Sequence, residues 1–120
     1  MDIQPAFDFR PREAARATDD VTSVMAAEDA ARNVSRGRML ALRLHYAHPA
    51  GLTDFELAKL SGWAQTSIGK RRGDLMNPKY FPTPLIEKTQ ETRPAPSGSP
   101  ARVWRITRAG MTFFEAEAAK

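Results

Sequence analysis

A chain of 120 residues can form one domain with a modest hydrophobic core, and its 18 basic and 14 acidic residues give a formal net charge of +4 at pH 7. It contains no cysteine, which excludes disulfides and thiolate metal sites and fits a reducing cytoplasm. The sequence has no apolar run near the ~18 residues of a membrane span and no secretory signal pattern, so we expect a soluble cytoplasmic protein without membrane contacts.

The charges are divided unevenly along the chain. Residues 1–31 hold seven acids and three bases, a net charge of −4, whereas residues 32–120 hold seven acids and 15 bases, a net charge of +8. A basic body of this kind favours a polyanionic partner, most simply nucleic acid. The alternative is the ordinary solvated surface of a basic protein.

The N-terminal segment changes character after its first 20 residues. Residues 1–20 combine Pro5, Pro11 and scattered charges without a sustained period, which predicts a flexible acidic arm. Residues 21–33 carry apolar side chains at near-helical spacing and predict a short helix. Its apolar stripe can pack on its own chain or on a second copy, so we note it as a possible homodimer contact.

The next stretch, residues 35–48, has the stronger helical pattern. Apolar side chains cover more than one stripe of this helix, which predicts a place at the centre of the core. Pro49 and the loop Ala50-Gly51 end it.

A shorter helix is predicted over residues 53–61. Thr53 and Glu56 match a capping box, in which the threonine oxygen accepts from the amide three residues on and the glutamate accepts from the cap amide. Gly62 stands where a helix C-terminus favours a residue in the left-handed conformation. We therefore expect a tight turn directly after Ser61.

The helix predicted over residues 65–76 has two different faces. Ile68 and Leu75 lie seven residues apart on a face that packs. The other face is left for contact with another molecule and carries Gln65, Thr66, Gly69, Lys70 and Gly73. Because Ala64 is a poor N-cap and two glycines lower the helix propensity, we expect packing to hold this helix in place.

The period changes again after Pro78, which ends the helical region. Residues 85–90 and 102–107 read as two strands, and the intervening residues 91–101 contain three prolines, a glycine and two serines. A β-hairpin with a long, flexible tip is expected. Thr107 can cap a final helix that runs from Arg108 to about residue 119.

This order of elements resembles a winged helix-turn-helix domain over about residues 35–110, and the domain is expected to span residues 34–120. In that fold a small residue, a glycine and a β-branched residue follow one another at fixed offsets, as Ala58, Gly62 and Ile68 do here. The resemblance implies an α+β, mainly helical fold with a C-terminal hairpin wing and flanking helices. More narrowly, the sequence is similar to small winged-helix proteins of actinobacterial phages and prophages, at Gly51-Leu52-Thr53, Glu56-Leu57, Ser61-Gly62, Ser67-Ile68, Arg71-Arg72, Asp74-Leu75, Thr92-Arg93-Pro94, Ser97-Gly98 and Val103-Trp104.

The resemblance also implies double-stranded DNA as the partner, with the helix at 65–76 in the major groove and the wing at 91–102 on the backbone or in the minor groove. Gln65 is then the candidate base reader, since a glutamine amide can pair bidentately with adenine. Thr66 and Ser67 would contact phosphates, and Lys70 would bind a phosphate or a guanine.

Further candidates for DNA contact lie around this helix and on the wing. Gly69 and Gly73 allow close approach of the helix to the duplex; the alternative is close packing within the protein, or mere tolerance of glycine. Arg71 is expected near the packed side, where an ion pair with Asp74 or Glu56 competes with a phosphate contact, whereas Arg72 is expected to be more exposed. The remaining basic candidates are Lys79, Arg93 and Arg102. The alternative for the wing is a solvated loop whose charge serves solubility.

Other chemistry finds little support in the sequence. Trp63 and Trp104 are interpreted as core residues in preference to stacking platforms for unpaired bases. His45 and His48 lie three residues apart but lack a third ligand nearby, so no metal site is expected. No catalytic constellation or cofactor motif is evident, and we expect neither enzymatic activity nor a cofactor.

The sequence thus predicts a DNA-binding transcription regulator of phage or prophage type, acting as a homodimer. A different class of function is a protein-interaction module that binds a host protein through the winged-helix surface. A third is a targeting module in DNA processing or replication initiation.

Overall fold

A computed structural model describes the backbone from Arg16 and the side chains from Ala26, and its contacts divide the chain into residues 1–33 and residues 34–120. Helix α1 (Arg16–Ala47) crosses this division and covers both helices expected at 21–33 and 35–48. The expectation of two separate helices is wrong, because no proline or glycine interrupts the chain between them. The expected arm is helical from Arg16 onward, and residues 1–15 lie outside the described residues.

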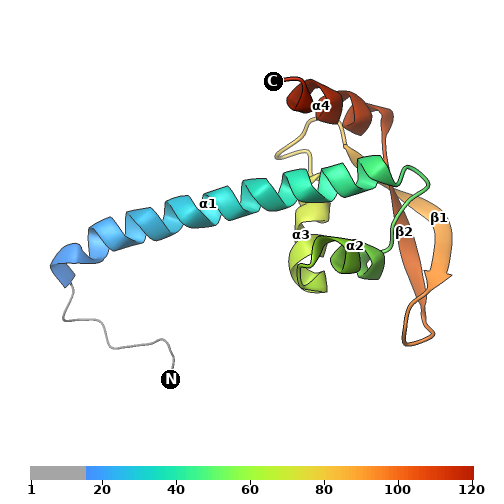
Figure 1. The fold of residues 1–120 in the computed structure, drawn as a ribbon, viewed down its shortest axis with the longest axis horizontal. Helices are drawn as coiled ribbons and strands as arrows, with labels where there is room; N and C mark the ends of the chain where they lie inside the picture. The colour runs from blue at the N-terminus through green and yellow to red at the C-terminus, as the bar shows by residue number, and fades with distance from the viewer. Residues whose placement is uncertain (1–15) are drawn as a thin grey trace. The chain divides into compact units, whose positions relative to one another are not determined.

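The core of residues 34–120 is built around the C-terminal part of α1. Ala41 and Leu42 on this helix are fully buried, as the predicted central position requires. Figure 1 shows this part of α1 between helix α4 and the pair α2–α3, with the hairpin at its end. The core cluster also contains Leu52, Leu57, Ile68, Leu75, Leu85, Ile86 and Ile106, with Trp63 and Trp104 packed against it as predicted.

Helix α2 (Asp54–Ser61) begins and ends as predicted. The Glu56 amide donates to Thr53 Oγ1 at 3.2 Å, and the Thr53 amide donates to Glu56 Oε1 at 2.9 Å, which confirms the capping box. Gly62 follows in the left-handed conformation with φ of 77°. Both ends of α2 are therefore fixed by local contacts.

Helix α3 (Gln65–Asp74) follows the turn and ends two residues before the predicted Met76. Ala64 occupies the N-cap position without a side-chain hydrogen bond. Ile68 is fully buried in the core cluster, so tertiary packing holds a helix that is weak on its own.

Strands β1 (Ile86–Pro94) and β2 (Pro100–Ile106) form the antiparallel hairpin and are longer than predicted. Pairing continues to Pro94 opposite Pro100, so the tip comprises residues 95–99 instead of 91–101. The two prolines lie at the strand ends, where a missing amide donor is tolerated. Leu52, just before α2, bridges to Trp104 of β2.

Helix α4 (Arg108–Ala118) starts at the predicted cap, where Thr107 Oγ1 accepts from the Gly110 amide at 2.9 Å. Its aromatic residues face the body of the domain. Phe114 packs against Tyr46 of α1 with ring centroids 4.6 Å apart and the ring planes tilted by 35°, and Phe113 meets Phe81 edge-on at 5.5 Å. These contacts fix α4 against α1 and the segment that follows α3.

Candidate nucleic-acid interface

Helix α3 exposes the face that the sequence assigned to contact. Of that predicted face, Gln65, Thr66 and Lys70 are exposed and the two glycines are half-buried. Ser67 is exposed as well, while Ile68 points into the core. Lys70 forms no ion pair with any residue that the structure describes. Its charge is therefore available to an external anion.

The two glycines of α3 have different surroundings. A Cβ built on Gly69 would lie 3.4 Å from Asp54 Oδ2, in ordinary van der Waals contact with that side chain. No atom of the described residues lies within 4 Å of a Cβ built on Gly73. Packing therefore requires glycine at neither position, and close approach to a duplex stays a prediction for both.

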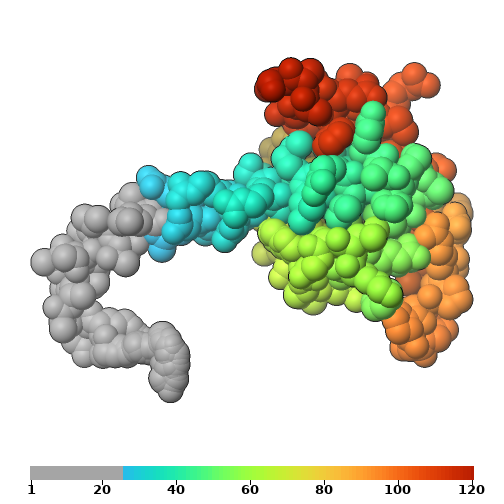
Figure 2. Space-filling model, viewed as in Figure 1, coloured from blue at the N-terminus to red at the C-terminus, as the bar shows by residue number. Residues whose placement is uncertain are grey.

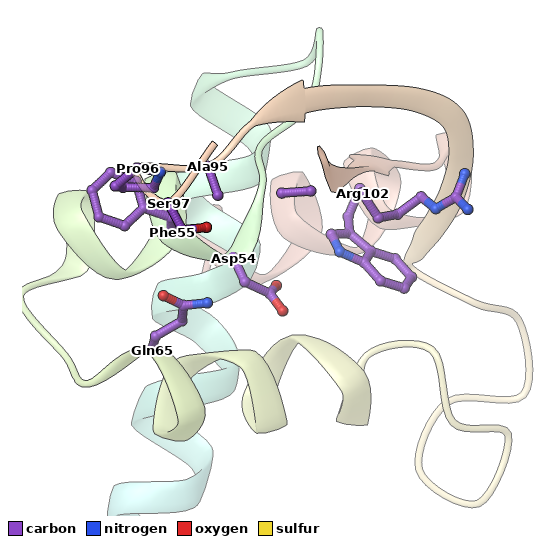
Figure 3. Close-up of a pocket in the computed structure, with 9 residues that line it drawn as sticks. Asp54, Phe55, Gln65, Ala95, Pro96, Ser97 and Arg102 are labelled. Carbon is purple, nitrogen blue, oxygen red and sulfur yellow. The ribbon is translucent and has the colours of Figure 1, made fainter. Parts of the chain in front are cut away.

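Helix α3 and the wing border a common hollow of about 500 Å³. Figure 3 shows Gln65 at the start of α3 and Asp54 at the start of α2, both projecting into the space beside the hairpin. The hairpin contributes Ala95, Pro96, Ser97, Ala101, Arg102 and Trp104 to the lining. The arrangement brings the predicted base reader and the predicted wing together. Figure 2 shows the hairpin tip, in orange, projecting beside α2 and α3, in green.

The two wing arginines already have partners inside the protein. Arg93 Nη1 donates to Glu56 Oε1 at 2.6 Å, which connects β1 to α2. Partial burial acts to raise the pKa of Glu56, but hydrogen bonds from the Thr53 amide and Arg93 outweigh it, so this pKa lies below its usual value. Arg102 Nη1 donates to the Thr89 carbonyl at 2.7 Å and forms no ion pair within the described residues. Of the two, Arg102 is the better placed to meet an anion.

Arg71 lies near the packed side, as predicted. Its side chain is 12% exposed, and its Nε lies 3.3 Å from Asp74 Oδ2. The same oxygen accepts from Arg38 Nε of α1 at 3.0 Å, and the Arg38 guanidinium stacks on Tyr80 at 4.1 Å. The ion-pair alternative for Arg71 is therefore the observed one. The second ion pair of Asp74, with Arg38, joins residues 36 positions apart and could not be inferred from helical spacing.

Arg72 is buried, so the prediction that it is more exposed than Arg71 is wrong. Its guanidinium donates to both carboxylate oxygens of Asp54 at 2.9 Å. It also lies 3.8 Å from the centroid of the Trp104 ring. The carboxylate and the aromatic face together stabilise the buried guanidinium. Because both partners lie outside α3, helical spacing could not predict the burial of Arg72.

Lys79 is exposed after α3, and its Nζ lies 5.8 Å from the Tyr80 ring centroid. Three of the ten predicted contact residues, Arg71, Arg72 and Arg93, form ion pairs within the protein. The predicted cations that can still bind an external anion are Lys70, Lys79 and Arg102. The sequence suggests Asp74 or Glu56 as a partner for Arg71 only. The pairs of Arg72 with Asp54 and of Arg93 with Glu56 were not anticipated, although both acids are visible in the sequence.

His45 of α1 is fully buried, and neither ring nitrogen has a hydrogen-bond partner in the described structure. Burial lowers its pKa from 6.5 to about 4, with the nearby charges of Arg72 and His48 acting in the same direction. The described residues contain no group of three or more His, Cys, Asp or Glu side chains that could hold a metal ion. Within the same residues, no helix combines the length and apolarity that crossing a membrane requires.

The fold is similar to that of solved transcription regulators. A Staphylococcus aureus MepR–DNA complex matches with a TM-score of 0.52 and 17% identity, covering 86% of this chain and 81% of that one. A structure of MepR, a transcription regulator of the Staphylococcus aureus multidrug efflux pump MepA, matches with a TM-score of 0.54 and 16% identity over 91% of this chain and 76% of that one. No family model and no curated protein matches the sequence. The similarity confirms the predicted fold, an α+β, mainly helical winged helix-turn-helix with a hairpin wing and flanking helices.

Proposed function

We propose that this protein is a double-stranded DNA-binding transcription regulator, with α3 in the major groove and the wing on the backbone or in the minor groove. The observation that carries the proposal is the common hollow that the exposed start of α3 and the wing border, with Gln65 on one side and Arg102 on the other. The similarity in fold to MepR, which has been solved with DNA, supports it. Gel retardation of double-stranded fragments tests it.

The proposal extends to a biological setting. The resemblance of the sequence to small phage and prophage winged-helix proteins favours a regulator of that kind, acting in the cytoplasm without enzymatic activity. A single module of this type buries on the order of 600–1,000 Å² on DNA. We therefore propose a homodimer, whose two copies would supply the specificity that one copy lacks. Sedimentation of the free and DNA-bound protein tests this.

Replacing Gln65 with alanine is expected to relax the base preference at one position of the selected site and to weaken binding there by about 1–3 kcal/mol. The side chain is exposed at the start of α3 and has no partner in the described residues, so the substitution leaves the fold intact. Binding of a panel of single-base variants of the selected site measures the effect. An unchanged preference at every position would remove Gln65 from the base-reading role.

Replacing Lys70 with alanine is expected to weaken binding to all sequences alike and to reduce the slope of log affinity against log salt by about 1, because one phosphate contact is lost. Fluorescence anisotropy at several salt concentrations measures both quantities. Lys120→Ala is the matched control, since it removes the same charge at the end of the chain, where Lys120 pairs with Glu117. Equal effects of the two substitutions would show that only net charge matters.

A second candidate is a protein-interaction module that binds a host protein. A specific feature favours it, an open apolar groove of about 740 Å³ between α4 and the segment after α3, lined by Tyr80, Phe81, Pro82, Leu85, Ala109 and Phe113. Apolar surface of this kind is more typical of protein contacts than of DNA contacts. Capture of a stoichiometric partner, lost on Phe113→Ser and retained on Lys70→Ala, would support this candidate.

A further inference from the structure

Arg72 joins three elements of the domain. It projects from α3, and its Nε donates to Asp54 Oδ1 at 3.1 Å while Nη2 donates to both carboxylate oxygens at 2.9 Å. Its guanidinium carbon lies 3.8 Å from the centroid of the Trp104 ring on β2. The side chain is only 11% exposed, so these contacts are largely shielded from solvent. We call the contacts of Arg72 with Asp54 and Trp104 the Arg72 junction.

Backbone hydrogen bonds also connect β2 to the start of α2. The Leu52 amide donates to the Trp104 carbonyl at 2.8 Å, and the Trp104 amide donates to the Leu52 carbonyl at 2.9 Å. Leu52 lies two residues before Asp54, so β2 is attached to the start of α2 by backbone and to α3 by the Arg72 side chain. The positions of α3 and the wing are thereby linked through one buried residue.

We propose that Arg72 is a positioning residue that holds the wing at a fixed place relative to α3 and so sets the spacing of the two elements that meet DNA. This inference rests on the proposed function. The role requires arginine, because a planar guanidinium can bind a carboxylate through two hydrogen bonds and stack on an indole at the same time, which an ammonium group cannot do. Arg72 does not contact DNA in this arrangement.

Asp54→Asn separates this role from a phosphate contact, because the two predict opposite signs. If Arg72 were a phosphate ligand held back by Asp54, removing the acid would free it, raise DNA affinity and steepen the salt slope by about 1. If Arg72 positions the wing, the substitution loosens the wing, and binding must then order it. We expect affinity about 10-fold lower, equivalent to about 1.4 kcal/mol, with no steeper salt slope.

Glu87→Gln is the matched control, because it also removes one acid from the domain. Glu87 pairs with Arg105 at 3.1 Å within the hairpin, and this pair connects only β1 to β2. Its effect on affinity measures the change that follows from net charge alone. The positioning role requires that Asp54→Asn bind more weakly than Glu87→Gln.

Arg72→Lys gives a second, independent comparison if Asp54→Asn fails to fold. A lysine keeps the charge and can hold a phosphate as a point charge, so a phosphate contact would survive the change. The positioning role would not survive it, and we expect a loss of about 10-fold here as well. In the free protein, the Leu52 and Trp104 amides should exchange with solvent faster in either variant than in Glu87→Gln.

The outcomes are distinguishable from one another. Wild-type protein that retards no DNA contradicts the proposed function, and this inference with it. Wild-type protein that binds while Asp54→Asn and Arg72→Lys bind equally well, or more tightly, overturns the positioning role alone. Weaker binding by both variants, with faster exchange at the Leu52 and Trp104 amides, supports it.

Discussion

Gly110→Ala is expected to destabilise the protein by about 3 kcal/mol or more. A Cβ at this position would lie 2.2 Å from the Leu85 carbonyl oxygen and 2.8 Å from Ile106 Cγ1. Because the closest atom belongs to the backbone, no side-chain rotation relieves the clash, and α4 must move away from the hairpin. Urea unfolding followed by circular dichroism measures the change.

Gly73→Ala is the matched control for this prediction. Both glycines are helical, but no described atom lies within 4 Å of a Cβ built on Gly73. Alanine there should stabilise the protein by up to about 1 kcal/mol, since it improves helix propensity without a clash. Equal free energies of unfolding for the two variants would contradict the close packing of α4 on Leu85.

Acid is expected to destabilise the fold through His45. This residue is buried with both nitrogens unpartnered, and its pKa falls from 6.5 to about 4. Between these values the unfolded chain binds a proton that the folded protein excludes, so stability rises with pH across the window and is lost as the pH falls. The expected loss between pH 7 and pH 4 is about 3 kcal/mol.

His45→Leu isolates this contribution from that of the carboxylates. Leucine fills a similar space without a titrating group or unsatisfied nitrogens, so we expect higher stability at pH 7 and a smaller loss between pH 7 and pH 4. Free energies of unfolding for both proteins at several pH values give the comparison. Parallel pH profiles for the two proteins would show that His45 does not titrate in this window.

The features that were readable from the sequence depend on neighbouring residues. The capping box of Thr53 and Glu56, the left-handed Gly62 and the Thr107 cap all lie within four residues of their partners, and the structure confirms each of them. The continuity of α1 is also a local property, but the apparent change of pattern near residue 33 concealed it. Capping residues and turns determine where these helices end. Hydrophobic periodicity alone did not show that α1 continues through residues 33–35.

The candidate site was harder to predict because its contacts are tertiary. Arg72 and Asp54 are separated by 18 residues and Arg93 and Glu56 by 37, so spacing on a single helix could not pair them. Helical periodicity placed Arg71 correctly because its partner, Asp74, is on the same helix. The exposed face of α3 was predictable for the same reason, since it follows from the buried position of Ile68.

The claim that α3 and the wing bind double-stranded DNA is tested most directly by gel retardation of mixed genomic fragments as salt rises from about 50 to 200 mM. We expect retarded complexes at low salt whose affinity falls by about three orders of magnitude across this range, because Lys70, Lys79 and Arg102 of both copies in the proposed homodimer meet phosphates. The absence of any retarded complex at the lowest salt concentration would contradict it.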